Sequence, residues 1–175
     1  MHCFIKLSFS LLLFSATHAY ADGGSFVISP SVGRASISNI DGYEKSRFVR
    51  IDGSLYPQPQ FGIGVFAARY PAFDASGSGN NVSIKLDGYG AGMTGRWSFN
   101  QNVQAYVRVE YMRWKVEASG LNRTLAKDEG GSAGLAVGMQ FPVKGSFGIK
   151  AEAAGYNNVS GADIRQLSLG LTFEL

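Results

Sequence analysis

The chain has 175 residues, 45% of them hydrophobic, and 16 basic against 13 acidic residues give a formal net charge of +3. So small a charge is not that of a nucleic-acid-binding protein, and the length is that of one ordinary domain. Cys3, His2 and His18 are its only cysteine and histidines. A chain cleaved after residue 21 would therefore hold no thiol and no imidazole, which excludes disulfides, nucleophilic thiolates and histidine metal ligands.

The first residues have the pattern of an export signal. Lys6 precedes a mostly apolar run over 7–16, and Ala19-Tyr20-Ala21 forms a small-x-small cleavage site before Asp22. The run is far shorter than the roughly 20 apolar residues that a membrane-spanning helix needs. We expect residues 1–21 to be a cleaved signal peptide and residues 22–175 to form a single domain.

Alternation of apolar and polar residues between groups of turn residues predicts eight strands, over 26–37, 48–56, 61–70, 84–97, 103–116, 132–141, 147–156 and 164–175. The last strand is the clearest, with Leu167, Leu169, Leu171, Phe173 and Leu175 at every second position. The connections alternate between short turns (57–60, 98–102 and 142–145) and longer polar loops (38–47, 71–83, 117–131 and 157–163). Short turns at one end and long loops at the other are typical of an outer-membrane barrel.

The two faces of the predicted strands differ in polarity. One face is entirely apolar or aromatic, whereas the other is charged, polar or very small. A soluble ligand-binding barrel would be apolar inside, so we expect a closed sheet whose apolar face meets lipid. Pro30 and Asp87-Gly88 interrupt the alternation, and we expect β-bulges or strand ends there.

The aromatic residues fall near the two ends of the predicted strands, as expected for rings at the two membrane interfaces. Near the short turns we expect an outer girdle of Phe26, Phe61, Trp97, Phe99, Phe141, Phe147 and Phe173. Near the long loops we expect a second one of Tyr43, Phe48, Tyr70, Tyr111, Trp114 and Tyr156.

This pattern resembles a family of small outer-membrane barrels, typified by the transmembrane domain of outer membrane protein A and by outer membrane protein X. The resemblance covers 22–175 and rests on the eight strands, on 88–92 leading to 99–102 and 106–111, and on the closing strand 167–173. It implies an all-β, eight-stranded antiparallel up-and-down transmembrane β-barrel in the outer membrane of a Gram-negative bacterium, with extracellular loops. It also implies that the assembly machinery recognises the last strand, although this chain ends on Leu175 where such barrels have an aromatic residue.

Eight charged residues on the inward face sum to zero charge. An eight-stranded barrel is only wide enough for side chains to fill it, and unpaired buried charges are too costly. We therefore expect one ion-pair network that plugs the interior, with a gated narrow conduit as the alternative. Its members are Arg50, Asp52, Arg96, Arg108, Glu110, Lys150, Glu152 and Glu174. Inward glycines such as Gly90 and Gly92 are expected to leave space for these long side chains.

A belt of cations continues the outward face toward the long loops and consists of Arg34, Arg47, Arg69, Lys85, Arg113, Lys115 and Arg165. Guanidinium groups match phosphate well, so the belt is a candidate contact for lipopolysaccharide in the outer membrane lipid; snorkelling at the interface is the alternative. Candidate loop contacts for a host or environmental ligand are Tyr43, Lys45, Leu121, Arg123, Leu125 and Lys127.

The function expected from these residues is that of a non-enzymatic surface barrel with a structural or adhesive role through its loops. A narrow channel for small solutes is the alternative. A membrane lipid-modifying enzyme is less favoured, because Arg108 and Lys150 should keep Glu110 and Glu152 ionised. We expect no catalytic residue, no metal site and no cofactor.

Overall fold

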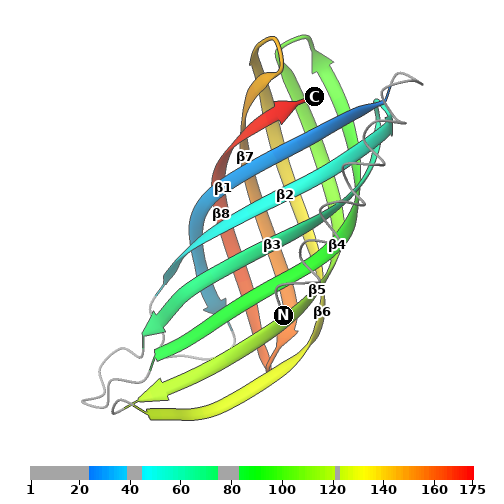
Figure 1. Cartoon of the computed structure of the whole chain (residues 1–175). Coiled ribbons are helices and arrows are strands. Elements are labelled where there is room, and N and C mark those ends of the chain that lie inside the picture. Colours follow the sequence, from blue (N-terminus) through cyan, green and yellow to red (C-terminus); the bar gives the residue numbers. More distant parts are fainter. Residues whose placement is uncertain (1–23, 39–44, 75–82, 121–122) are drawn as a thin grey trace.

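The computed structural model describes residues 24–38, 45–74, 83–120 and 123–175. They form eight antiparallel strands that close into a barrel in sequence order, β1 to β8 (Figure 1). The strands are β1 (Ser25–Ser38), β2 (Ser46–Gln58), β3 (Phe61–Asp74), β4 (Ser83–Asn100), β5 (Val103–Gly120), β6 (Arg123–Lys144), β7 (Phe147–Val159) and β8 (Ala162–Glu174). The predicted fold class is confirmed. The predicted signal segment 1–21 lies outside the described residues.

The seam of the barrel joins the first and last strands. β1 and β8 pair antiparallel from Val27↔Glu174 to Ser38↔Asp163. Next to this ladder, the Phe26 N–H donates to the Leu175 carbonyl at 3.2 Å, and the Leu175 N–H donates to the Phe26 carbonyl at 2.8 Å. The sheet therefore has no open edge along this seam, which removes the unpaired backbone groups that lipid does not tolerate.

The strands alternate between exposed apolar and buried polar residues, as predicted. Leu167 and Leu169 are 68% and 64% exposed, whereas Gln166 and Ser168 between and beside them are buried. Across the barrel, Val49 and Ile51 face outward while Arg50 and Asp52 are buried. The inverted polarity that the sequence predicts is thus a property of the folded barrel.

Strand bounds differ from the prediction at the long-loop end. The short turns lie where expected, at 59–60, 101–102 and 145–146. However, the predicted loop 117–131 is wrong, because β5 runs to Gly120 and β6 begins at Arg123, so that β6 extends well past β7 (Figure 1). The predicted loop 157–163 is also wrong, since a two-residue turn at Ser160 and Gly161 joins β7 to β8. The other two predicted loops fall partly outside the described residues.

The expected bulges are absent from both predicted positions. The register of β1 with β2 is unbroken from Ser25 to Ala35, and Pro30 is simply exposed on the outer face. The register of β4 with β5 is unbroken from Ser83 to Ser98, and Asp87 also faces outward. Asp87 interrupts the apolar pattern without disturbing its ladder, whereas beside Pro30 the β1–β8 ladder lacks the pairs of Ser29 and Pro30 and keeps its register on both sides of this gap.

Of the two predicted aromatic girdles, the one near the long loops is wrong. At the short-turn end, Phe61, Trp97, Phe99, Phe141 and Phe173 are exposed on the outer wall. At the other end only Tyr111 of the described members faces outward, and Tyr43 lies outside the described residues. The other four, Phe48, Tyr70, Trp114 and Tyr156, are buried inside. Phe48, Trp114 and Tyr156 share strand parity with inward charges, and Tyr70 shares it with the inward Gly62 and Gly64 of β3; that signal places all four inside.

In the part of the chain that the structure describes, no helix is long and apolar enough to cross a membrane.

Candidate functional site

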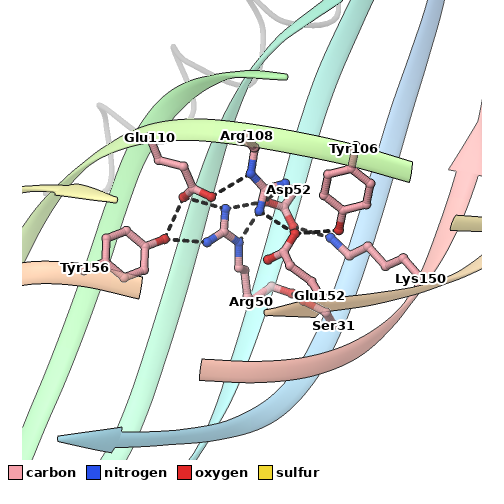
Figure 2. Close-up of polar contacts among 9 residues, drawn as sticks. All are labelled: Ser31, Arg50, Asp52, Tyr106, Arg108, Glu110, Lys150, Glu152 and Tyr156. Carbon is pink, nitrogen blue, oxygen red and sulfur yellow. Dashed lines mark hydrogen bonds and ion pairs between the residues drawn. The ribbon is translucent and has the colours of Figure 1, made fainter. Parts of the chain in front are cut away.

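The barrel interior holds a cluster of charged side chains from β2, β5 and β7 (Figure 2). Arg50 on β2 lies at its centre. Its Nε donates to Asp52 Oδ1 at 2.8 Å and its Nη2 donates to Glu110 Oε2 at 2.9 Å. The side chain of Arg50 is fully shielded from solvent, so both contacts are made where Coulomb attraction is least screened.

Arg108 on β5 contacts the carboxylates of Glu110, Glu152 and Asp52. Its Nε donates to Glu110 Oε1 at 2.6 Å, and its Nη2 donates to Glu152 Oε2 at 2.7 Å. Its Nη1 lies 3.4 Å from Asp52 Oδ1. Lys150 completes the group, with its Nζ donating to Asp52 Oδ2 at 2.8 Å.

These six residues, which we call the six-residue cluster, are Arg50, Asp52, Arg108, Glu110, Lys150 and Glu152. Three cations balance three carboxylates, and every member makes a contact shorter than 3 Å. Desolvating six charges is expensive, and the cost is offset only when each is paired and hydrogen-bonded. The arrangement therefore forms one interdependent unit across the lumen.

Two tyrosines that the sequence reasoning missed are part of this unit. The Tyr156 hydroxyl accepts from Arg50 Nη1 at 2.7 Å and donates to Glu110 Oε2 at 2.6 Å. The Tyr106 hydroxyl donates to Glu152 Oε2 at 2.7 Å. In addition, the Arg50 guanidinium lies 3.9 Å from the centre of the Phe66 ring. Both tyrosines share strand parity with a charged member, which is the signal that could have found them; Phe66 shares parity with the inward glycines Gly62 and Gly64 of β3.

Arg96 and Glu174 form a separate pair nearer the short turns. Arg96 Nη2 lies 3.6 Å from Glu174 Oε1, and the Glu174 side chain is 41% exposed. The Arg96 guanidinium lies 4.0 Å from the centre of the Tyr56 ring, and its Nε donates to the Pro59 carbonyl. The single network expected from the sequence is thus two groups, one buried at the centre and one at the mouth.

Toward the long-loop end, apolar side chains fill the lumen beyond the six-residue cluster. The Phe48 and Tyr70 rings stack with centroids 5.2 Å apart, and the Tyr70 and Phe73 centroids are 6.1 Å apart. We call this group the apolar layer; its members are Phe48, Tyr70, Phe73, Leu86, Met112, Trp114, Tyr156, Val159 and Ile164, all buried. Because Tyr156 also contacts Arg50 and Glu110, it connects the two layers.

The inward glycines mainly make room for aromatic rings of the interior. A Cβ at Gly90 would collide with Phe66, at Gly134 with Tyr156, and at Gly138 with Tyr106. Two glycines leave space for charged side chains, as expected from the sequence. A Cβ at Gly92 would meet Glu110 Cγ at 3.3 Å, and a Cβ at Gly170 would meet Lys150 Cε at 3.0 Å. Small residues thus make room for the large side chains that close the interior.

All seven residues of the predicted cation belt lie exposed on the outer wall. Arg69 Nε donates to Asp87 Oδ1 at 2.8 Å, and Lys85 lies opposite Glu117 in the β4–β5 register. Lys115 lies opposite Glu129 in the β5–β6 register. The other four are Arg34, Arg47, Arg113 and Arg165.

The predicted loop contacts do not form one group in the described part of the chain. Lys45 and Leu125 are exposed, whereas Lys127 pairs with Glu117 at 3.1 Å. Tyr43, Leu121 and the side chain of Arg123 lie outside the described residues.

The chemistry open to the interior is limited by this pairing. Both Glu110 and Glu152 accept hydrogen bonds from Arg108, which holds them as acceptors rather than as proton donors. Within the described ranges no group of three or more acidic, histidine or cysteine residues is placed to hold a metal ion. The geometry is that of a filled interior.

Comparison with solved structures finds other small outer-membrane barrels. Neisserial surface protein A is 16% identical with a TM-score of 0.65, over 86% of this chain and 96% of its own. Ail of Yersinia pestis, crystallised with the heparin analogue sucrose octasulfate, is 15% identical with a TM-score of 0.60, over 87% of this chain and 97% of its own. OprG of Pseudomonas aeruginosa is 8% identical with a TM-score of 0.61, over 87% and 96%.

Among curated proteins, no sequence matches this chain. Its residues 7–174, however, match the sequence profile described as the outer membrane protein beta-barrel domain. With the apolar outer wall and the closed eight-stranded sheet, this match shows that the chain belongs to the outer membrane protein beta-barrel family and is an integral protein of the bacterial outer membrane.

Proposed function

We propose that this protein is a closed, non-enzymatic barrel that acts through its outer wall and loops, with a structural or adhesive role, and not as a pore. The observation that carries the proposal is the filled lumen. The six-residue cluster and the apolar layer follow one another along the barrel axis, and Tyr156 of the apolar layer contacts Arg50 and Glu110 of the cluster.

Barrel width supports this proposal. Eight strands enclose a space that side chains fill, whereas larger barrels leave an aqueous channel. Opening the cluster would separate Arg50 or Arg108 from carboxylates at 2.6 to 2.9 Å and leave charges unpaired in a poorly solvated interior. The apolar layer would have to rearrange as well.

Planar bilayer recordings test the closed state. We expect the purified barrel to give no stable open level, with a reconstituted large porin as the positive control. Stable openings of hundreds of picosiemens, present in independent preparations, would favour the narrow-channel alternative.

An enzymatic function is not supported by the interior. Beyond residue 18 the chain has neither histidine nor cysteine. The carboxylates that could act as acid or base, Glu110 and Glu152, are bound by Arg108 and by tyrosine hydroxyls.

An adhesive role is favoured by an exposed feature of the β5–β6 hairpin. Leu125 is 61% exposed on the part of β6 that extends beyond β7, and Lys45 is exposed at the same end of the barrel. Ail, which shares the fold, was crystallised with a sulfated sugar. We infer that a polyanionic surface polysaccharide is the class of ligand to test.

The adhesion test compares bacteria that display the wild type or the double variant Leu125→Ser with Lys45→Gln. We expect the double variant to reduce binding to immobilised heparin. Val143→Ser, which changes an equally exposed residue at the short-turn end, is the matched control and should leave binding unchanged. Equal binding by all three strains would remove these residues from the proposal.

A further inference from the structure

The cation belt divides into two parts that differ in local charge balance. On β3 to β6, carboxylates lie beside the cations: Asp87 pairs with Arg69 at 2.8 Å, Glu117 lies opposite Lys85, and Glu129 lies opposite Lys115. Glu117 also pairs with Lys127 at 3.1 Å, and Arg113 on β5 lies opposite Tyr89 and Gly131, without an acidic partner in register. Carboxylates therefore balance much of the charge on this part, and Arg113 remains as an isolated cation.

The part on β8, β1 and β2 is different. Arg34 and Arg47 lie directly opposite each other in the β1–β2 register, and Arg165 lies two positions further along the β1–β8 ladder, opposite Ser36. We call these three the arginine trio. None of the three forms an ion pair with any described residue. The nearest acidic residue on the same face of β8, Asp163, accepts a hydrogen bond from the Asn158 N–H at 3.0 Å.

Like charges directly opposite on neighbouring strands are destabilising, because their Cβ atoms are only about 5 Å apart. An anion between them would convert this repulsion into attraction. Guanidinium groups bind phosphate with two parallel hydrogen bonds each, so an exposed pair of arginines with no protein carboxylate suits a phosphate group.

Beside the trio, the outer wall has a shallow apolar trough along β7. Its floor consists of the small residues Ala151, Ala153 and Gly155, which we call the β7 trough. Larger residues stand on both sides in register: Met139, Val137 and Leu135 on β6, and Leu169 and Leu167 on β8. One hollow on the outer wall is lined both by these residues and by Arg34, Arg47 and Arg165.

The trough leads to the trio. Gly155, at its long-loop end, is flanked by Leu135 on β6 and by Arg165 on β8. A ligand with an acyl chain and a phosphate at one end could lay the chain over Ala151 and Ala153 and place the phosphate at Arg165, Arg34 and Arg47. Within the membrane the acyl chain would gain van der Waals contact with the walls of the trough, in competition with other lipids for the same surface.

We propose that this face of the barrel binds one phosphorylated, acylated glycolipid of the lipid A type, with an acyl chain in the β7 trough and a phosphate on the arginine trio. The proposal deepens the proposed function by naming the partner of the outer wall. It does not depend on a closed lumen, so lipid binding and bilayer conductance can fail independently.

Native mass spectrometry of the full barrel in detergent tests the phosphate contact. The probes are diphosphoryl lipid A, the same lipid without phosphates, and phosphatidylglycerol. We expect the triple variant R34Q/R47Q/R165Q to retain lipid A about tenfold less or worse, because charge-assisted hydrogen bonds are lost. The control R69Q/K85Q/K115Q removes the same number of cations and should retain lipid A nearly as well as the wild type.

Three outcomes would overturn the phosphate contact. The two triple variants could lose lipid A equally, which would indicate general snorkelling of a cationic belt. Dephosphorylated lipid A could bind as well as the phosphorylated form. Phosphatidylglycerol could compete on equal terms, which would indicate an unspecific lipid phosphate contact.

The variant Ala153→Leu tests the trough by filling it. We expect lower retention of lipid A than for Ala91→Leu, a matched change on the outer face of β4. Unchanged retention would remove the trough from the proposal. For every variant, the heat-modifiable gel mobility of a closed barrel shows that it has folded.

Discussion

At the scale of single residues, Arg108 is the member of the six-residue cluster that contacts every carboxylate. Its three nitrogens reach Asp52, Glu110 and Glu152 at 3.4, 2.6 and 2.7 Å. A lysine could supply the charge but not this planar set of donors. The geometry of the guanidinium therefore lets one side chain contact carboxylates on β2, β5 and β7 at once.

The variant Arg108→Met should be strongly destabilised, because it keeps the volume of the side chain but leaves three buried carboxylates with two cations. We expect the free energy of unfolding to fall by about 3–5 kcal/mol. Denaturant unfolding in detergent micelles, followed by loss of the compact gel band, measures this change.

Lys127→Met is the control for Arg108→Met. It breaks the ion pair with Glu117, in which both side chains are at least 40% exposed. Such a pair contributes about 1 kcal/mol at most. Similar losses for the two variants would contradict the view that burial makes the cluster important.

At the scale of strands, much could be predicted from alternation alone. The eight strands and their inward and outward faces follow from period-two patterns such as that of Leu167 to Phe173. The ends of β5 and β6 could not be predicted in this way, because their outer faces become charged, with Lys115, Glu117, Lys127 and Glu129. Cross-strand pairs of opposite charge keep these segments in the sheet, but the apolar signal is lost.

The interior was only partly predictable for a related reason. Strand parity places Phe48 and Trp114 on the inward face. The preference of aromatic rings for the membrane interface, however, led to the incorrect prediction that they lie on the outer wall. Charge balance indicated pairing among the eight inward charges. It carried no information on depth, so it did not separate Arg96 and Glu174 from the buried six.

The variant Gly134→Ala tests the fit of one strand against its neighbour. A methyl group at this position on β6 would lie inside the contact distance of the Tyr156 ring on β7. We expect a loss of about 1–3 kcal/mol in the free energy of unfolding, as overpacked cores show. Equilibrium denaturation in micelles is the measurement.

Gly53→Ala provides the comparison for Gly134→Ala. Its Cβ would face outward and meet only the Phe26 ring at 3.5 Å, an ordinary contact. If Gly134→Ala were as stable as Gly53→Ala, the ring would have room to move and the tight packing proposed for the lumen would be wrong.

At the scale of the whole molecule, the lumen and the outer wall of the barrel have different roles. The lumen is neutral and filled, so its charges serve to hold strands together across the axis. In the described part of the chain, the outer wall is apolar over most of its height, and the arginine trio on β8, β1 and β2 has no carboxylate opposite any of its members. Interaction with the surroundings is therefore expected from the outside of the barrel and from the end where β5 and β6 extend.

The seam between β1 and β8 has a consequence for biogenesis. The strands that close the ring are the first and the last of the sheet in sequence order, and Phe26 and Leu175 exchange main-chain hydrogen bonds beside that ladder. A nascent polypeptide lacking β8 would present two bare ladders of amide and carbonyl groups to hydrocarbon, which makes a partial ring untenable. Integration is thus all-or-none: a message truncated before the eighth strand yields material for proteolysis and not a smaller barrel.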